Sequence, residues 1–187
     1  MSRTYGPIRQ IAFVVRDLDD ALQYWTETLG VGPFFVLRNV APDDFHYRGE
    51  PSPSPRMSLA LGNSGDLQVE IIEQHDDAPS AYRDFLDSGR EGMQHVSSWV
   101  TRDEYDAVMK RMLDDGVEVA HSGAMAAAGV RFAYFATDTA PGGLLYEMAD
   151  VLDPQIYPLM EMVATATRHP SFTGPMRSES GMRASVK

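Results

Sequence analysis

The fold of this chain is decided by two similar stretches that lie almost half a chain apart. The later one, Gly92-Met93-Gln94-His95-Val96-Ser97-Ser98-Trp99-Val100, reads as a strand. The earlier one, Ile8-Arg9-Gln10-Ile11-Ala12-Phe13-Val14-Val15, resembles it and has Gln10 where the later one has His95. β-Branched and apolar residues favour strands in both places. If the two stretches are copies, the chain is a duplicated module whose chemistry lies where the halves meet.

Each of these strands leads into an amphipathic helix. Asp17-Leu18-Asp19-Asp20 begins the first helix, with acids that suit the positive end of the helix dipole, and Thr101-Arg102-Asp103-Glu104 begins the second. Three further strands are expected after each helix, at 32–40, 57–61 and 67–72, and then at 117–120, 131–136 and 144–148. Both halves therefore predict strand, helix and three strands, in an α+β fold.

The spacing of polar residues supports a duplication. His95 lies 85 positions after Gln10, and Glu147 lies 77 positions after Glu70, a smaller offset that fits shorter loops in the second half. A period this long that occurs twice indicates paired modules rather than a solenoid.

The chain divides into one domain and a C-terminal extension. The domain, 1–152, contains module one at 7–75, an acidic linker helix at 76–91 and module two at 92–152. We expect a loop at 41–56, with a short extended piece near 45–47, because that segment is rich in Pro, Asp and Gly. A closing helix at 153–167, which contains Pro158, and a loose tail at 168–187 follow.

The composition narrows the class of protein. The chain has 187 residues, a net charge of −11 and no cysteine, which excludes disulfides and thiolate metal sites. The negative charge argues against nucleic-acid binding, and no stretch approaches the roughly 20 apolar residues of a membrane span. The N-terminus lacks the apolar run of a signal peptide. We expect a cytoplasmic protein with neither a nucleic-acid nor a membrane partner.

Four polar side chains are expected to face the inside of the sheet: Gln10, Glu70, His95 and Glu147. Two carboxylates, an imidazole and an amide oxygen suit a divalent ion with open positions. Each residue also has a structural alternative, since a lone strand histidine is usually a hydrogen-bonded core residue, and alternating acids often face solvent. Their matching places in two copies favour a shared site, because an inward carboxylate without a partner is costly.

These stretches resemble the vicinal oxygen chelate superfamily, which contains glyoxalase I, methylmalonyl-CoA epimerase, extradiol dioxygenases and bleomycin-resistance proteins. The resemblance covers about residues 7–152 and includes Gln68-Val69-Glu70-Ile71-Ile72, Gly92-Met93-Gln94-His95-Val96 and Gly143-Leu144-Leu145-Tyr146-Glu147. It implies two tandem βαβββ modules that form an open, curved mixed sheet barrel around a central metal site. It also favours a homodimer, because the family often dimerises.

The resemblance implies that Gln10, Glu70, His95 and Glu147 bind one divalent metal ion. This set is similar to that of the animal type of glyoxalase I, which favours zinc, with nickel, cobalt, manganese or iron as alternatives. The last glutamate of that enzyme is also the base, so Glu147, or else Glu70, is the expected catalytic group.

Three differences between this sequence and members of the family bear on the expected reaction. The places where glyoxalase I has an Arg and an Asn for glutathione hold Val14 and Gln74, so glutathione is not the expected substrate. The epimerase's separate catalytic glutamate has no counterpart in 57–61. Extradiol dioxygenases need two histidines and a carboxylate, and His95 stands alone at the ligand places.

The expected function is proton transfer next to a metal-bound carbonyl, through an enediolate or enolate, by an isomerase, epimerase or lyase. The partner is a small oxygenated substrate, with possible contacts from His46, Tyr47, Arg131 and Tyr134. His46 could equally be an ordinary loop residue, and Arg131 could pair with surface acids. The alternatives are a non-catalytic binding protein of the bleomycin-resistance kind and a non-haem iron dioxygenase.

Overall fold

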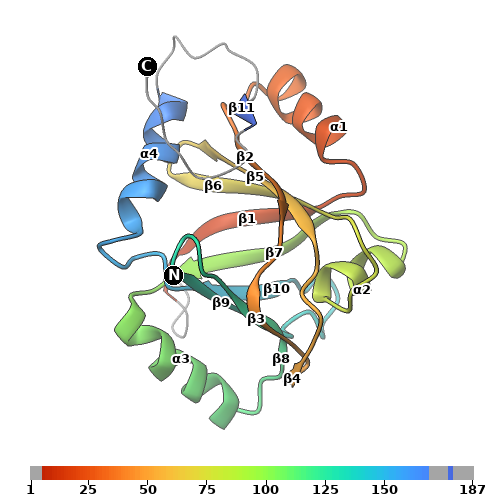
Figure 1. The fold of residues 1–187 in the computed structure, drawn as a ribbon, viewed down its shortest axis with the longest axis vertical. Helices are drawn as coiled ribbons and strands as arrows, with labels where there is room; N and C mark the ends of the chain where they lie inside the picture. The colour runs from red at the N-terminus through yellow and green to blue at the C-terminus, as the bar shows by residue number, and fades with distance from the viewer. Residues whose placement is uncertain (1–5, 169–176, 179–187) are drawn as a thin grey trace.

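The computed structural model describes residues 6–168 and 177–178, which form one strongly curled sheet with helices around it (Figure 1). The strands follow the order β11-β2-β5-β6-β1-β7-β10-β9-β8-β3-β4. Their bounds are Ile8–Val14 (β1), Phe35–Val40 (β2), Asp43–Tyr47 (β3), Glu50–Pro51 (β4), Met57–Ser64 (β5), Leu67–Gln74 (β6), Gly92–Trp99 (β7), Val119–Met125 (β8), Val130–Phe135 (β9), Leu145–Ala149 (β10) and Arg177–Ser178 (β11). The helices are α1 (Leu18–Gln23), continued by a π-helical turn, η1 (Tyr24–Thr28), then α2 (Ala81–Asp87), α3 (Arg102–Asp114) and α4 (Tyr157–Arg168).

The two modules have the same topology and meet at the centre of the sheet. Module one runs β2-β5-β6-β1 and module two runs β7-β10-β9-β8, with β1 parallel to β6 and β7 parallel to β10. β1 and β7 are antiparallel neighbours in the middle of Figure 1. The predicted α+β fold of two βαβββ modules in an open, curved sheet barrel is therefore confirmed.

One helix of each module covers the outer face of its own half-sheet. Leu18 and Leu22 of α1 pack in a buried cluster with residues of β5 and β6, and Tyr105 and Met112 of α3 do the same on β9 and β10. Both helices begin at capped residues, as predicted: the Asp17 side chain accepts a backbone N–H, and Thr101 forms a capping box.

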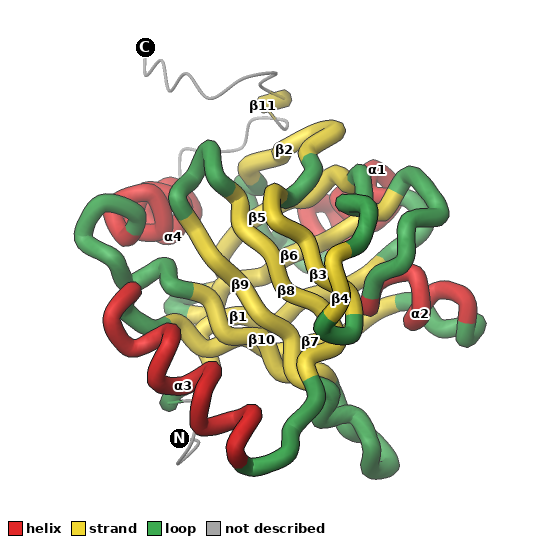
Figure 2. The backbone as a smooth tube through the Cα atoms, turned by 60° about the horizontal axis from the view of Figure 1, so that its bottom comes forward, coloured by secondary structure: helices red, strands yellow, loops and turns green. Residues whose placement is uncertain are grey.

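The chain between β2 and β5 brings the two outer edges of the sheet together. β2 pairs with β5 at the edge of module one, whereas β3, only two residues later, pairs with β8 at the edge of module two. Two or three residues span at most about 10 Å, so the sheet must curl until these edges nearly meet. The expected loop at 41–56 is thus partly wrong, because a β3-β4 hairpin occupies 43–51 and extends the sheet (Figure 2).

Two helices lie at the ends of the curled sheet. The linker predicted at 76–91 contains α2 at Ala81–Asp87, and the closing helix begins later than predicted, at Tyr157, which places Pro158 in its first turn. Within the described ranges, no helix has the length and apolarity to cross a bilayer. Most of the predicted tail, 168–187, lies outside the described residues.

Candidate metal centre

Cross-strand register places Glu70 and His95 on either side of one small residue. Ala12 of β1 pairs with Glu70 of β6 on one side and with His95 of β7 on the other. Ala12 is fully buried, and its methyl group is much shorter than the two side chains that flank it.

The next set of cross-strand partners repeats this arrangement, with the central small residue now in module two instead of module one. Ser97 of β7 pairs with Gln10 of β1 on one side and with Glu147 of β10 on the other. Ser97 lies 85 positions after Ala12, the same offset that relates His95 to Gln10. The four predicted ligand positions are therefore related by the approximate twofold axis of the modules.

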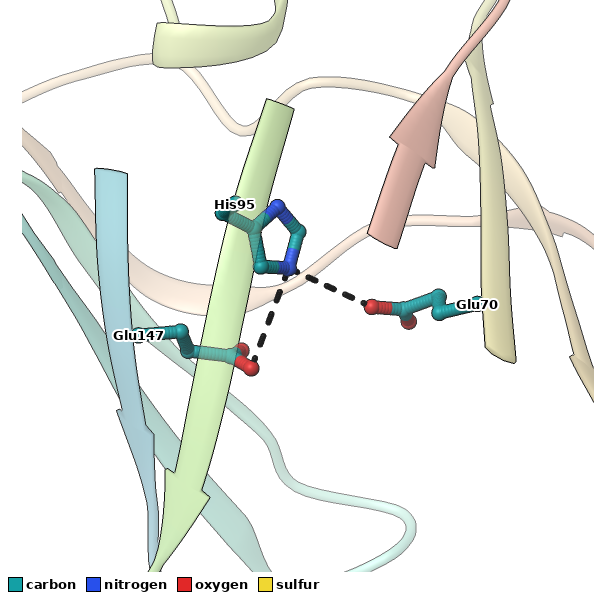
Figure 3. A group of neighbouring side chains, drawn as sticks. All are labelled: Glu70, His95 and Glu147. Atoms are coloured by element: carbon teal, nitrogen blue, oxygen red, sulfur yellow. Dashed lines mark ion pairs between the residues drawn. The ribbon is translucent and has the colours of Figure 1, made fainter. Parts of the chain in front are cut away.

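Three of the four side chains converge inside the sheet. The ligating atoms of Glu70, His95 and Glu147, here called the triad, all lie within 4.8 Å of one another. His95 Nε2 is 3.6 Å from Glu70 Oε2 and 3.9 Å from Glu147 Oε2 (Figure 3). All three residues are buried, with His95 fully so. Such a cluster of oxygen and nitrogen donors is suited to a divalent cation.

The fourth position, Gln10, has an oxygen without a partner. Its Nε2 donates to Gln68 Oε1 over 2.7 Å, while its own Oε1 is buried and makes no hydrogen bond among the described residues. A buried acceptor without a donor is unfavourable by about 1–3 kcal/mol. A cation beside the triad would satisfy it, so the residues present fit a bound metal ion.

The electrostatics of the triad favour a cation. Burial raises the pKa of Glu70 to about 7 and also raises the pKa of Glu147. Burial lowers the pKa of His95 to about 4, an effect that the Glu147 charge opposes. The imidazole is therefore neutral near pH 7 and does not compensate the carboxylates.

Gln94 sets the tautomer of His95 through a β-bulge. The register shifts between Ala12 and Phe13, so Gln94 and His95 of β7 occupy one place opposite Ala12. Gln94 Nε2 donates to the carbonyl of Ala81, which leaves Gln94 Oε1 to accept the Nδ1–H of His95 over 2.6 Å. His95 Nε2 therefore presents its lone pair to the two carboxylates, as a metal ligand requires.

Two phenol groups lie against the triad. The Tyr134 hydroxyl of β9 donates to His95 Nε2 over 3.2 Å, and the Tyr82 hydroxyl of α2 donates to Tyr134 over 2.9 Å. Tyr134 and Ser97 also act to lower the pKa of Glu147, against the larger effect of burial. The predicted substrate contact Tyr134 is therefore placed next to the candidate ligands.

The other predicted contacts lie farther out. The Tyr47 hydroxyl donates to the Asp84 carboxylate of α2. His46 is partly exposed, with Nδ1 3.1 Å from the carbonyl of Asp44. The Arg131 guanidinium bonds to Asp150, to Asp106 and to the carbonyl of Arg102, and it stacks on Tyr105 of α3. The structure thus directs Arg131 towards α3, on the outer face of the sheet.

A cavity of about 630 Å³ lies beside α2. Its lining includes Gln94 and Leu145, which are the residue before His95 and the cross-strand partner of His95. The cavity is therefore lined by direct neighbours of His95.

Comparison with known proteins identifies the superfamily to which the chain belongs. A family model described as the glyoxalase/bleomycin resistance protein/dioxygenase superfamily matches residues 9–135, more than half of the chain. The chain therefore belongs to this superfamily, as the sequence resemblance predicted. None of the curated proteins matches the chain.

Solved structures agree on the fold. Methylmalonyl-CoA epimerase from Mycobacterium tuberculosis superposes with a TM-score of 0.55 and 22% identity, over 82% of this chain and 92% of that one. A hypothetical protein from Bacillus halodurans superposes with a TM-score of 0.52 and 20% identity, over 76% of this chain and 92% of that one. The third structure is a variant methylmalonyl-CoA epimerase from Streptomyces coelicolor in complex with 2-nitronate-propionyl-CoA. It superposes with a TM-score of 0.52 and 19% identity, over 76% of this chain and 94% of that one. At these identities the likeness shows the shared fold.

Sequence reasoning missed three residues that contact the site or its neighbours: Gln94, Tyr82 and His121. Gln94 precedes the predicted ligand His95, but strict alternation places it on the opposite face. Tyr82 lies within the acidic linker helix expected at 76–91, and His121 directly follows the strand expected at 117–120. A bulge and the packing of α2 bring them inward, and neither has a signal in the local sequence pattern.

Proposed function

We propose that this chain is a divalent-metal-dependent enzyme that moves a proton next to a carbonyl group of a small oxygenated substrate, as an isomerase, epimerase or lyase. The observation that carries the proposal is the convergence of Glu70, His95 and Glu147 donor atoms within 4.8 Å inside the sheet. Two buried carboxylates beside a neutral imidazole need a compensating charge, and Gln10 supplies a further oxygen donor. The donor set favours zinc.

Glu147 is the group that we assign to proton transfer. When bound, the ion would polarise the carbonyl oxygen of the substrate. Burial raises the pKa of Glu147 above its ordinary value, which suits a general base that must take up and return a proton. Its cross-strand partner on β9 is Tyr134, whereas the partner of Glu70 on β5 is Leu61. A hydroxyl group thus lies beside Glu147 and not at the equivalent position beside Glu70.

The iron dioxygenases and the non-catalytic binding proteins share this fold, so the fold does not distinguish them from the proposed enzyme. The donor atoms of the site must distinguish the three classes. The iron-dioxygenase alternative needs two histidine ligands, and the donors that converge include only His95 among the described residues. The non-catalytic alternative gives no reason for two buried carboxylates. We therefore favour proton transfer by an enzyme, in a homodimer as the family resemblance suggests.

Elemental analysis of the purified protein, with chelator competition to measure metal affinity, tests the proposal. We expect about one divalent ion per chain, and a large loss of affinity in Glu147→Gln. Glu118→Gln, at an exposed acid, is the matched control and should bind the ion as the wild type does. The proposal fails if no stoichiometric ion is found or if Glu147→Gln binds metal normally. Catechol-dependent oxygen consumption by iron-loaded protein would support the dioxygenase instead.

A further inference from the structure

A second histidine, His121 of β8, lies inside the sheet next to the metal centre. It is fully buried. Its cross-strand partner is Tyr134, which is in turn the partner of Glu147, so the three side chains follow one row. Its ring lies edge-on among four aromatic rings, with centroid distances from 4.2 Å to 6.0 Å: those of Phe45, Tyr82, Phe132 and Tyr134.

One hydrogen bond determines the tautomer of His121. The backbone N–H of Ala81, the first residue of α2, donates to His121 Nδ1 over 3.2 Å. An accepting Nδ1 carries no proton, so the neutral ring is protonated at Nε2. Burial lowers the pKa of His121 to about 3, which keeps the ring neutral at physiological pH.

The Nε2–H group of His121 has no acceptor among the described residues. A buried donor without an acceptor is unfavourable, and native proteins rarely tolerate it without a reason. Aromatic rings surround this group, and no described residue supplies its acceptor. The Nε2–H is therefore free to donate to a molecule bound beside it.

His121 and His95 have opposite tautomers. His95 donates from Nδ1 to Gln94 and offers the Nε2 lone pair, which is what a metal ligand needs. His121 accepts at Nδ1 and offers Nε2–H, which repels a cation and attracts an oxygen. The second histidine is thus suited to bind an oxygen atom and not to complete the metal ligand set.

Neighbours of both imidazoles line the same cavity. Gln94, beside His95, lines the cavity of about 630 Å³, and so do Ala81 and Ala120, which are the hydrogen-bond partner of His121 and the residue before it. The cavity is therefore lined by residues that bond or adjoin both rings.

We propose that His121 donates its Nε2–H to an oxygen atom of the substrate, a carbonyl, carboxylate or enolate oxygen, held beside the triad. This role rests on the proposed function and adds to it a donor from the chain that orients the substrate. The substrate then presents at least two oxygen atoms, one towards the triad and one towards His121.

Oxalate, a planar dianion with paired oxygens, is the probe. Isothermal titration calorimetry with zinc-loaded protein compares the wild type with His121→Phe, which keeps a ring in the aromatic cluster, and His121→Gln, which can keep a donor. We expect oxalate affinity to fall about 10- to 100-fold in His121→Phe, the worth of a hydrogen bond to a charged acceptor, and less in His121→Gln. Phe132→Leu, which alters the same cluster without removing a donor, should change it less than about threefold.

Two further readouts separate this role from packing and from the metal. Zinc affinity, measured by chelator competition, should stay within about threefold in all three variants. The imidazole ¹⁵N spectrum of the wild type should show His121 protonated at Nε2, with its N–H signal moving when oxalate is added to the zinc-loaded protein.

The possible results are distinguishable. Wild-type protein that binds no zinc overturns the proposed function, and this inference with it. Zinc binding together with unchanged oxalate affinity in His121→Phe overturns the inference alone. A His121 ring protonated at Nδ1 overturns it whatever the ligand results show, even if the variants fail to fold.

Discussion

Replacement of Glu70 by glutamine should stabilise the metal-free protein while it impairs metal binding. The Glu70 carboxyl is buried, and burial raises its pKa from 4.5 to about 7. The folded protein therefore binds a proton more tightly at this site than the unfolded chain does. Between pH 4.5 and 7 the free energy of unfolding falls as pH rises, and above pH 7 the full penalty of an ionised, buried carboxylate remains.

The size of the effect follows from the difference between the two pKa values. Each unit of pKa corresponds to about 1.4 kcal/mol, so the penalty on the folded state is about 3 kcal/mol at pH 8. Glutamine has nearly the same shape and no charge. Glu70→Gln should therefore raise the free energy of unfolding of the metal-free protein by up to about 3 kcal/mol at pH 8 and by almost nothing at pH 4.

Urea unfolding of chelator-treated protein at pH 8 and pH 4 measures this difference. Glu118→Gln, at an exposed acid, serves as the control and should lie within about 0.5 kcal/mol of the wild type at both pH values. Zinc should raise the melting temperature of the wild type by mass action and have little effect on Glu70→Gln. A variant that is no more stable at pH 8, or equally stabilised at both pH values, would refute the reasoning.

Three other substitutions test separate parts of the site and fold. Gln94→Leu removes the acceptor of the His95 Nδ1–H; we expect zinc affinity to fall about 10- to 100-fold by chelator competition, and the imidazole ¹⁵N spectrum to show mixed tautomers. Ala12→Leu fills the space beside His95; calorimetry should show no zinc binding, and urea unfolding a loss of about 1–3 kcal/mol, whereas Ala12→Ser should retain binding. Asp17→Ala removes the cap of α1; it should cost about 1 kcal/mol in urea unfolding without a change in zinc affinity.

The duplication could be predicted because its signals are local and repeat. A strand with inward polar residues, a capped amphipathic helix and three strands are each readable from periodicity, and their offsets agree between the halves. The twofold relation between Gln10 and His95, and between Glu70 and Glu147, then follows from the topology. The structure adds that Ala12 and Ser97, two small residues at equivalent positions, separate the longer side chains in each row.

The surroundings of the triad could not be predicted in the same way. A β-bulge breaks the alternation at Gln94, and the β3-β4 hairpin pairs with a strand some 75 residues away along the chain. Neither the bulge nor this pairing can be recognised in a stretch of ten or fifteen residues of sequence. Both depend on how the sheet curls, which is set by packing between elements that are distant in sequence.

The divergence between the two modules explains why the sequence indicates a metal site more readily than a reaction. The ligand positions are equivalent in both modules, but their neighbours are not. Next to Glu70 the row continues to Leu61 and Phe35, whereas next to Glu147 it continues to Tyr134 and then His121. Both modules supply ligand positions, but among the described residues of these rows hydroxyl and imidazole groups lie in module two. The substrate should therefore bind on the side of module two, where these donors can distinguish its oxygen atoms.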